Sequence, residues 1–166
     1  MKSTTILAID PGTREMGVAV LDGERLIYAG VKAIPKGHTP HDTLAACREV
    51  VLRCLRDFRP ATLVVEKTFI GKNRNAALLN VLSDEIVALG RRHQGRVVSL
   101  APNTVKKALT GDGSADKAEV ARAVVRRFPE LKAYLDQNRK WKARFHANMF
   151  DAVALGMVAL QATAPA

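Results

Sequence analysis

The sequence predicts an α/β domain built around a mixed β-sheet, and three observations support this prediction. Three short apolar runs open the chain, at about residues 5–10, 16–21 and 25–32, with turn signals between them. Two further apolar runs, at 62–65 and 97–100, alternate with segments of helical periodicity. Neighbouring antiparallel strands followed by strands that alternate with helices form a mixed sheet. No repeat, linker or low-complexity segment divides the 166 residues, so a single domain is expected.

Asp10 ends the first apolar run, and Pro11 and Gly12 open a turn directly after it. A buried strand is an unfavourable place for a carboxylate unless the group is paired or holds a metal ion. Asp before Pro-Gly is also common turn chemistry, so this stretch alone leaves a structural and a functional interpretation open. Asp22-Gly23, between the second and third runs, predicts a tight hairpin turn.

Apolar residues that repeat every three or four positions predict helices in the rest of the chain. The expected helices cover residues 43–58, 76–93, 104–110, 115–128 and about 147–161. Asn103 is the expected N-cap of the third of these helices. Residues 132–145 are basic and are expected to be irregular. Trp141 lies in this segment, where it either stacks on a base or sugar or anchors a loop.

Two more acids occur in apolar surroundings and match the setting of Asp10. Glu66 follows the run at 62–65, and Asp151 lies in the apolar helix near the C-terminus. Carboxylates that converge from two strands and a helix repel one another unless cations neutralise them. Oxygen ligands suit Mg²⁺ or Mn²⁺, and two such ions ~3.5–4 Å apart promote phosphodiester hydrolysis. The three acids therefore indicate a candidate metal-dependent nuclease site.

The charge of the chain points to a polyanionic partner. Lys and Arg number 26 against 16 Asp and Glu, which gives a formal net charge of +10. Nucleic acid is favoured over a membrane surface, because no long basic amphipathic helix, membrane span or signal peptide is apparent. Cys47 and Cys54 lie in one predicted helix, too far apart for a disulfide, and are expected to be reduced core thiols.

Several short motifs follow one another along the chain, and together they carry a family resemblance. They are Ile-Asp-Pro-Gly-Thr at 9–13, Val-Val-Glu at 64–66 with Phe69 and Lys72-Asn73 after it, Val105-Lys106, and Gly-Ser-Ala-Asp-Lys at 113–117. In their order and spacing, from residue 7 to about 160, they resemble the RuvC family of Holliday-junction resolvases, the crossover junction endodeoxyribonucleases. The resemblance implies a ribonuclease-H-like fold, with a mixed five-stranded sheet and helices on both faces.

The resemblance also implies an activity and partners. RuvC-type enzymes are homodimers that resolve four-way DNA junctions by paired symmetrical nicks, in homologous recombination and DNA repair. We therefore expect an endonuclease that uses two Mg²⁺ or Mn²⁺ ions per subunit. We further expect a bacterial cytoplasmic, nucleoid-associated protein that works with a branch-migration complex of the RuvA and RuvB type and has no membrane partner.

By resemblance, individual residues acquire expected roles. Asp10, Glu66 and Asp151 are the expected catalytic metal ligands, and Lys117 is an expected catalytic lysine near the scissile phosphate. The expected DNA contacts are Phe69, Lys72, Asn73, Arg74, Lys106, Lys107 and Lys117. The predicted helix at 76–93 would form the dimer contact. Taken as bare residues, Phe69 also fits a core position, and Lys106 and Lys107 also fit solvent-facing positions.

The chain departs from the family pattern at two places. The family has a second acid or a histidine three residues before the last Asp, where this chain has Asn148. Residues three apart share a helix face, so Asn148 can offer an amide oxygen to the site of Asp151. His146 reaches that site only if the helix begins late, so we favour Asn148 over His146 as the fourth ligand. Asp84-Glu85 stands where the family usually has Arg-Gly, and both acids are interpreted as surface residues.

Other functions remain open at this point. Asn148 brings no charge, which leaves room for a junction-binding module with weak or no cleavage. A related ribonuclease-H-like nuclease on other branched DNA is also consistent with the motifs. Asp-x-Gly-Thr after a first strand occurs in actin-like sugar kinases and ATPases as well, but those proteins have two such domains and far longer chains.

Overall fold

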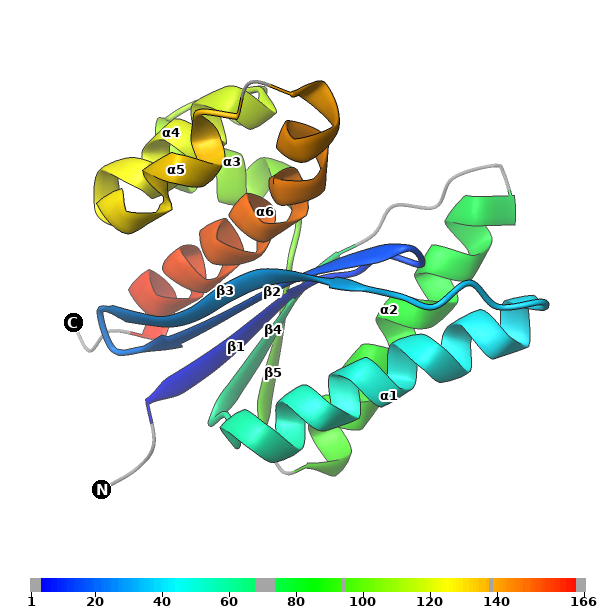
Figure 1. Ribbon diagram of the computed structural model, residues 1–166. Coiled ribbons are helices and arrows are strands. Elements are labelled where there is room, and N and C mark those ends of the chain that lie inside the picture. Colours follow the sequence, from blue (N-terminus) through cyan, green and yellow to red (C-terminus); the bar gives the residue numbers. More distant parts are fainter. Residues whose placement is uncertain (1–3, 68–73, 94, 138, 164–166) are drawn as a thin grey trace.

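A mixed five-stranded β-sheet lies at the centre of the molecule (Figure 1). The computed structural model describes residues 4–67, 74–93, 95–137 and 139–163. The strands are β1 (Thr5–Asp10), β2 (Glu15–Asp22), β3 (Arg25–Ala33), β4 (Thr62–Glu66) and β5 (Arg96–Leu100). Their order is β3-β2-β1-β4-β5, with antiparallel pairing among β1 to β3 and parallel pairing of β4 with β1 and β5. The predicted mixed sheet is confirmed.

Helices cover both faces of this sheet, as predicted. They are α1 (Pro40–Phe58), α2 (Arg74–Arg92), α3 (Pro102–Thr110), α4 (Lys117–Arg127), the 3₁₀ helix η1 (Pro129–Leu131), α5 (Lys132–Leu135) and α6 (Lys140–Thr163). α1 and α2 pack on one face, and α6 packs on the other with α3 and α4 beside it (Figure 1). Within the described ranges, no helix combines the length and the hydropathy needed to cross a bilayer.

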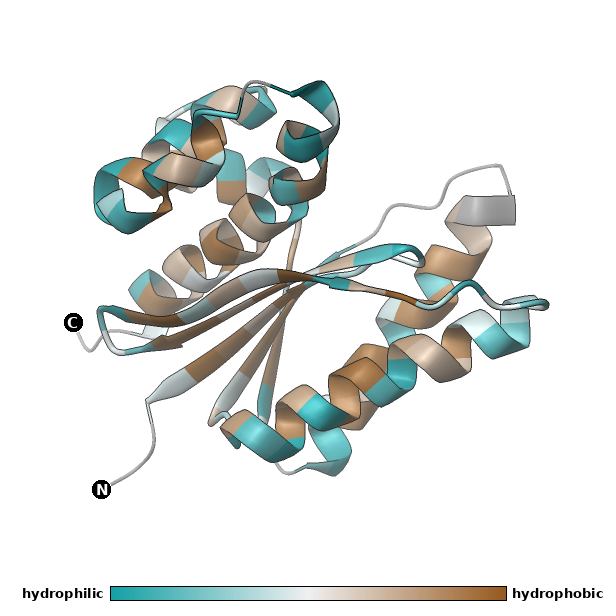
Figure 2. Cartoon of the chain, in the orientation of Figure 1, coloured by the Kyte–Doolittle hydropathy of each residue, from teal (hydrophilic) through white to brown (hydrophobic). Residues whose placement is uncertain are grey.

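Side-chain alternation along the strands divides the core into two layers. In β1, Ile6 and Ala8 belong to the layer against α6, whereas Leu7 and Ile9 belong to the layer against α1 and α2. The strands are accordingly apolar along their length, while hydrophilic residues colour the outward sides of the helices (Figure 2). Burial on both faces explains why the sequence shows continuous apolar runs rather than strict alternation.

Two expectations about the C-terminal half are wrong. α3 begins at Pro102 after Ala101, which makes no side-chain cap bond, so Asn103 is not the N-cap. Proline favours the first helical position because its φ is already helical and its missing N–H is not needed there. Residues 132–145 are not irregular, because α5 covers the first of them and α6 begins at Lys140. The first turns of α6 are exposed, so they carry charged residues instead of the apolar periodicity that predicts a helix. No proline interrupts α6, so the helix continues through this segment.

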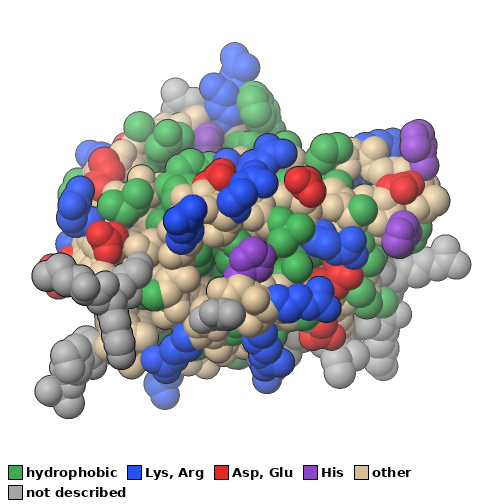
Figure 3. Space-filling view, turned by 90° about the horizontal axis from the view of Figure 1, so that it is seen from below, with side chains coloured by type: hydrophobic (Ala, Val, Ile, Leu, Met, Phe, Trp, Pro, Cys, Tyr) green, Lys and Arg blue, Asp and Glu red, His purple; other side chains and the backbone are tan. Residues whose placement is uncertain are grey.

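An ion pair joins α1 to α2. Arg48 Nη2 lies 2.8 Å from Glu85 Oε1, and Glu85 Oε2 is buried without a hydrogen-bond partner among the described residues. Glu85 is therefore a half-buried interhelical residue, and its interpretation as a surface acid is wrong, whereas Asp84 is exposed as predicted. Viewed from the side of these two helices, basic and acidic side chains are interspersed (Figure 3).

The two cysteines are free and buried, as predicted. Burial, together with the nearby Glu85 carboxylate, raises the pKa of the Cys47 thiol to about 11. The Cys47 thiol donates a hydrogen bond of 3.7 Å to the main-chain oxygen of Gly12. This contact attaches α1 to the turn that follows Asp10.

Candidate active site

Asp10 and Glu66 lie side by side at the carboxyl ends of two parallel strands. β1 and β4 pair in register through Ile9 and Val65, so the residues one position further are neighbours. Both acids face α6, because the residues two positions earlier in each strand belong to the core layer against α6. Ser83 of α2 donates a hydrogen bond of 3.4 Å to the main-chain oxygen of Glu66 from the other side of the sheet.

α6 crosses the same face of the sheet and brings Asn148 and Asp151 to the two strand acids. A Cβ atom on Gly17 would overlap the main-chain carbonyl of Asn148 and would lie 3.2 Å from the Cβ of Asp10. Gly17 is also the β2 partner of Asp10 in the antiparallel ladder. The absent side chain of Gly17 therefore sets how closely α6 approaches Asp10.

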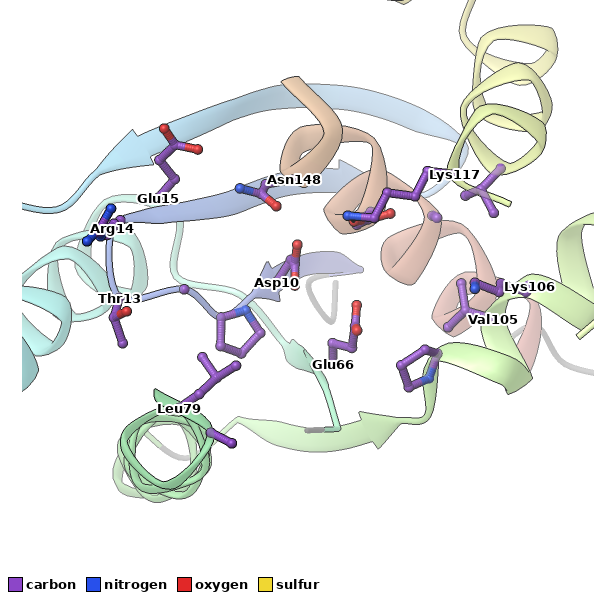
Figure 4. Close-up of a pocket in the computed structure, with 17 residues that line it drawn as sticks. Asp10, Thr13, Arg14, Glu15, Glu66, Leu79, Val105, Lys106, Lys117 and Asn148 are labelled. Carbon is purple, nitrogen blue, oxygen red and sulfur yellow. The ribbon is translucent and has the colours of Figure 1, made fainter. Parts of the chain in front are cut away.

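These four side chains border a cavity of about 730 Å³ (Figure 4). Figure 4 shows Asp10, Glu66 and Asn148 directed toward its centre, while Lys117 and Lys106 approach from α4 and α3. Further residues on the wall are Thr13 and Arg14 from the β1–β2 turn, Glu15 at the start of β2, and Ala76 and Leu79 from α2. The cavity thus combines acids at its centre with cations around its margin.

Asp10, Glu66 and Asp151 lie in surroundings that disfavour the ionised form of each carboxyl group. Burial raises the pKa of Asp10 well above its usual value, and the charges of Glu66 and Asp151 raise it further. Burial and, to a smaller extent, the charge of Asp151 raise the pKa of Glu66 to about 7. The pKa of Asp151 is raised by burial as well, although Lys117 and Lys106 oppose that shift. Such mutually raised pKa values mark a site that favours added positive charge.

Lys117 supplies part of that positive charge. Its Nζ lies 3.5 Å from Asp151 Oδ2, and its side chain is 70% exposed at the first residue of α4. Asp116 N-caps this helix through a capping box with Glu119, which defines where Lys117 leaves the backbone. A lysine that is largely open to solvent can be displaced from Asp151 at low cost, because exposed ion pairs contribute little stability.

The donor set fits divalent cations that prefer oxygen. Among the described residues, no three His, Cys, Asp or Glu side chains are grouped closely enough to hold one ion by themselves. Mg²⁺ does not require such a cage, because it keeps several waters and is held by one or two carboxylates together with substrate phosphates. Three half-buried carboxylates and one amide around an open cavity match that mode of binding.

The chain matches a family model described as crossover junction endodeoxyribonuclease RuvC over residues 6–157. The chain belongs to the RuvC family. It is 38% identical over 121 residues to the RuvC of a Bradyrhizobium species (strain BTAi1), an alignment that covers 70% of this chain and 69% of the relative. Identity to the RuvC of Methylococcus capsulatus is 36% over 125 residues, covering 73% and 75%. RuvC proteins form a family of endodeoxyribonucleases.

Solved RuvC-family structures share the fold. T. thermophilus RuvC in complex with a Holliday junction substrate superposes with a TM-score of 0.72, at 22% identity, covering 95% of this chain and 94% of the other. The yeast mitochondrial Holliday junction resolvase Ydc2 gives a TM-score of 0.64 at 12% identity, covering 95% and 78%. The expected ribonuclease-H-like fold is therefore confirmed.

The structure places six of the expected site residues around the cavity: Asp10, Glu66, Lys106, Lys117, Asn148 and Asp151. His146 does not line it: because α6 begins at Lys140, this side chain is turned to another helix face, where its ring lies 4.8 Å from that of Tyr134. Lys107 is exposed on α3 and does not reach the cavity either. Phe69, Lys72 and Asn73 lie outside the described residues, as does the side chain of Arg74 at the start of α2.

Sequence reasoning missed three residues that shape the RuvC-type cavity. Gly17 sets the approach of α6, and its only signal was a glycine inside an apolar strand, which indicates close backbone contact. Ser83 supports the end of β4 from α2, and nothing in the sequence marked it. Arg14 lies on the cavity wall, and its basic charge directly after the Asp10 turn was the available signal.

Proposed function

We propose that this RuvC-family protein is a structure-selective endonuclease. It resolves four-way Holliday junctions by paired symmetrical nicks, in homologous recombination and DNA repair. The whole chain acts as one nuclease domain. The observation that carries the proposal is the convergence of Asp10, Glu66 and Asp151 from two strands and a helix on one open cavity with cationic walls.

Asp10, Glu66, Asp151 and the amide oxygen of Asn148 would hold two Mg²⁺ or Mn²⁺ ions. When bound, such ions activate a water for attack on the phosphodiester and stabilise the charge on the leaving oxygen. The raised pKa values of the three acids support this assignment, because added cations remove the repulsion that keeps protons on them.

The cations of the cavity wall would act on the DNA itself. Lys117, at the mouth of the cavity, would leave Asp151 and offset the negative charge that grows on the phosphate during cleavage. Lys106 on α3 and Arg14 on the opposite wall would bind the flanking phosphates and align the scissile bond. Lys107, and Phe69, Lys72 and Asn73 outside the described residues, remain proposed DNA contacts on the ground of family resemblance alone.

Cutting two opposed strands requires two active sites, so we place the enzyme as a homodimer. α2 is the proposed contact, and Val81 on this helix is 48% exposed although it is a large apolar residue. A second subunit packed on α2 would remove this apolar surface from water. A branch-migration complex of the RuvA and RuvB type is the proposed further partner, in the bacterial cytoplasm near the nucleoid.

The proposal is tested by incubating the protein with a synthetic four-way junction, labelled on one strand at a time, in Mg²⁺ or Mn²⁺. Symmetrical nicks on opposed strands, absent with EDTA, are the expected result. A linear duplex and a forked duplex of the same sequence serve as controls. Equal cutting of the fork would indicate a nuclease for other branched DNA.

A junction-binding module is the second candidate, favoured by the uncharged Asn148 in the cavity. Tight binding of an uncut junction in both metals would select it. If the protein hydrolyses ATP and leaves the junction uncut, it belongs instead to the kinase and ATPase class that shares the Asp-x-Gly-Thr motif.

A further inference from the structure

The N-terminal turns of α6 carry an exposed tryptophan among cations. Trp141 is 61% exposed, the largest exposed fraction among the large apolar side chains of the described residues that stand open to solvent. Arg139, Lys140, Lys142 and Arg144 surround it, and no acid occurs between residues 137 and 150. A tryptophan is normally buried for most of its surface, so this arrangement requires a reason other than core packing.

Trp141 lies on the same face of α6 as the residues that enter the cavity. Trp141, Arg144, Asn148 and Asp151 are spaced by three, four and three residues, which places them in one stripe along a regular helix. With a rise of ~1.5 Å per residue, Trp141 lies ~10 Å before Asn148 and ~15 Å before Asp151 along the axis. The stripe therefore leads from the acids out of the cavity to the exposed indole.

The face of α6 that carries Trp141 and Arg144 is open to solvent and positively charged. His146 points to another side, where its ring packs against Tyr134 of α5, whereas Trp141 and Arg144 on the stripe are exposed. The Lys142 ammonium lies 5.6 Å from the centroid of the Trp141 ring, so a positive charge stands directly beside the aromatic surface. An indole with adjacent ammonium and guanidinium groups presents both parts of a nucleotide site: a stacking surface for a base and cations for its phosphates.

We infer that Trp141 stacks on an unpaired base of the DNA strand whose phosphate occupies the cavity, and that Arg144 and Lys142 bind the phosphates between the two points. This inference rests on the proposed function. At 3.4 Å per nucleotide, a separation of ~10–15 Å corresponds to about three or four nucleotides from the scissile phosphate. A base in a continuous duplex has no free face, so the contact selects DNA that is open near the branch point.

The protein as it exists provides a direct probe, because Trp141 is its only tryptophan. The wild-type chain is titrated with an unlabelled four-way junction in EDTA, where no cleavage occurs, and binding is followed in parallel by anisotropy of a labelled junction. We expect quenching of the indole emission that saturates together with the anisotropy, and weaker quenching with a linear duplex. Full anisotropy with unchanged emission would overturn the inference and leave the proposed nuclease function standing.

Variants then measure what the contact contributes. Trp141→Ala is expected to weaken junction binding about 5- to 150-fold, the loss typical of one stacked base, and Trp141→Phe is expected to lose less. Ile27→Ala is the matched control, since Ile27 is another exposed apolar residue, on β3 and 48% exposed, and should bind as wild type. Equal losses in Trp141→Ala and Ile27→Ala would contradict the assignment.

A junction with single abasic sites separates stacking from general attraction. Removing the base three or four nucleotides from the cut should weaken the wild type and leave Trp141→Ala unchanged, so that the two losses do not add. Additive losses would overturn the inference. Quenching without nicking in Mg²⁺ or Mn²⁺ would keep the stacking contact and end the nuclease proposal. Emission that depends on protein concentration without DNA would assign the indole to a second copy of the chain instead.

Discussion

At the scale of single residues, Asp10 illustrates a conflict between stability and activity. Its half-buried carboxylate lies next to Glu66 and Asp151, and its pKa is raised well above the usual value because charge is unfavourable there. The positive charge of Lys117 at the cavity margin partly opposes this rise in pKa. Under the proposed function, the repulsion is what makes the cavity bind cations.

Asp10→Asn should therefore have opposite effects on stability and on cleavage. The free energy of unfolding of the metal-free protein should rise by ~1 kcal/mol or more at pH 8, since each unit of a raised pKa corresponds to ~1.4 kcal/mol. Nicking should fall by at least ~10³-fold, because metal assistance is worth several kcal/mol. Urea unfolding and single-turnover cleavage measure the two effects. Asp84→Asn, an exposed acid on α2, is the control and should change neither.

Asn148→Asp tests the residue in which this chain departs from the family. A fourth carboxylate should tighten cation binding, so the Mg²⁺ concentration for half-maximal nicking should fall several-fold. The same change should destabilise the metal-free protein, because it adds a like charge beside Asp10 and Asp151. A metal titration that superposes on the wild-type curve would show that Asn148 is not a ligand.

At the scale of elements, the site depends on the contact between β2 and α6. Gly17→Ala would push a methyl group into the main chain at Asn148 and displace α6 from Asp10. We expect a loss of stability of ~1–3 kcal/mol, as for other overpacked positions, together with weaker Mn²⁺ binding. Gly95→Ala is the matched control, because its added Cβ would make only ordinary contacts of 3.6 Å or more. Calorimetric titration with Mn²⁺ and thermal unfolding provide the readouts.

The dimer proposal also belongs to an element, the helix α2. Val81→Lys should shift the protein toward monomers, because it places a charge on the exposed apolar position of the proposed contact. Sedimentation velocity measures this change. Because a monomer has one active site, the two opposed strands of a junction should then be nicked independently. Junctions with a single nick should accumulate before ligatable products appear. If Val81→Lys sediments as the wild type does, α2 is not the contact.

At the scale of the whole molecule, the acids make stability depend on pH and on metal. Glu66 has a pKa of about 7 in the folded protein against a usual value of 4.5, so between these values the folded state binds more protons than the unfolded state. The free energy of unfolding of the metal-free protein should therefore fall as pH rises through this range, by up to ~3 kcal/mol.

Saturating Mn²⁺ should reverse that dependence, because cations bind the ionised carboxylates of the folded state and become more effective as pH rises. Thermal unfolding between pH 5 and 8, with Mn²⁺ and with EDTA, measures both slopes. Glu66→Gln should flatten the metal-free slope. A metal-free protein whose stability rises over this range would contradict the electrostatic account of the cavity.

The sequence by itself determined the strands, the two strand-end acids and the family. Apolar runs ending at Asp10 and Glu66 are local signals, because a buried strand tolerates a carboxylate only where it has a use. The order of motifs from residue 7 to about 160 can likewise be recognised without knowing the structure. The family model, which covers residues 6–157, agrees with that range. Sequence motifs and apolar runs of this kind can be recognised without knowing how the helices and strands pack.

Only the tertiary structure decided which residues meet. Periodicity did not reveal that α6 begins at Lys140, because the first turns of that helix lie outside the core and carry charge in place of an apolar stripe. That early start turns His146 away from the acids and aligns Trp141 with Asn148. Gly17 gains its meaning only where α6 crosses β2. Register and helix crossing are long-range properties, so the acids were predictable one by one and their arrangement was not.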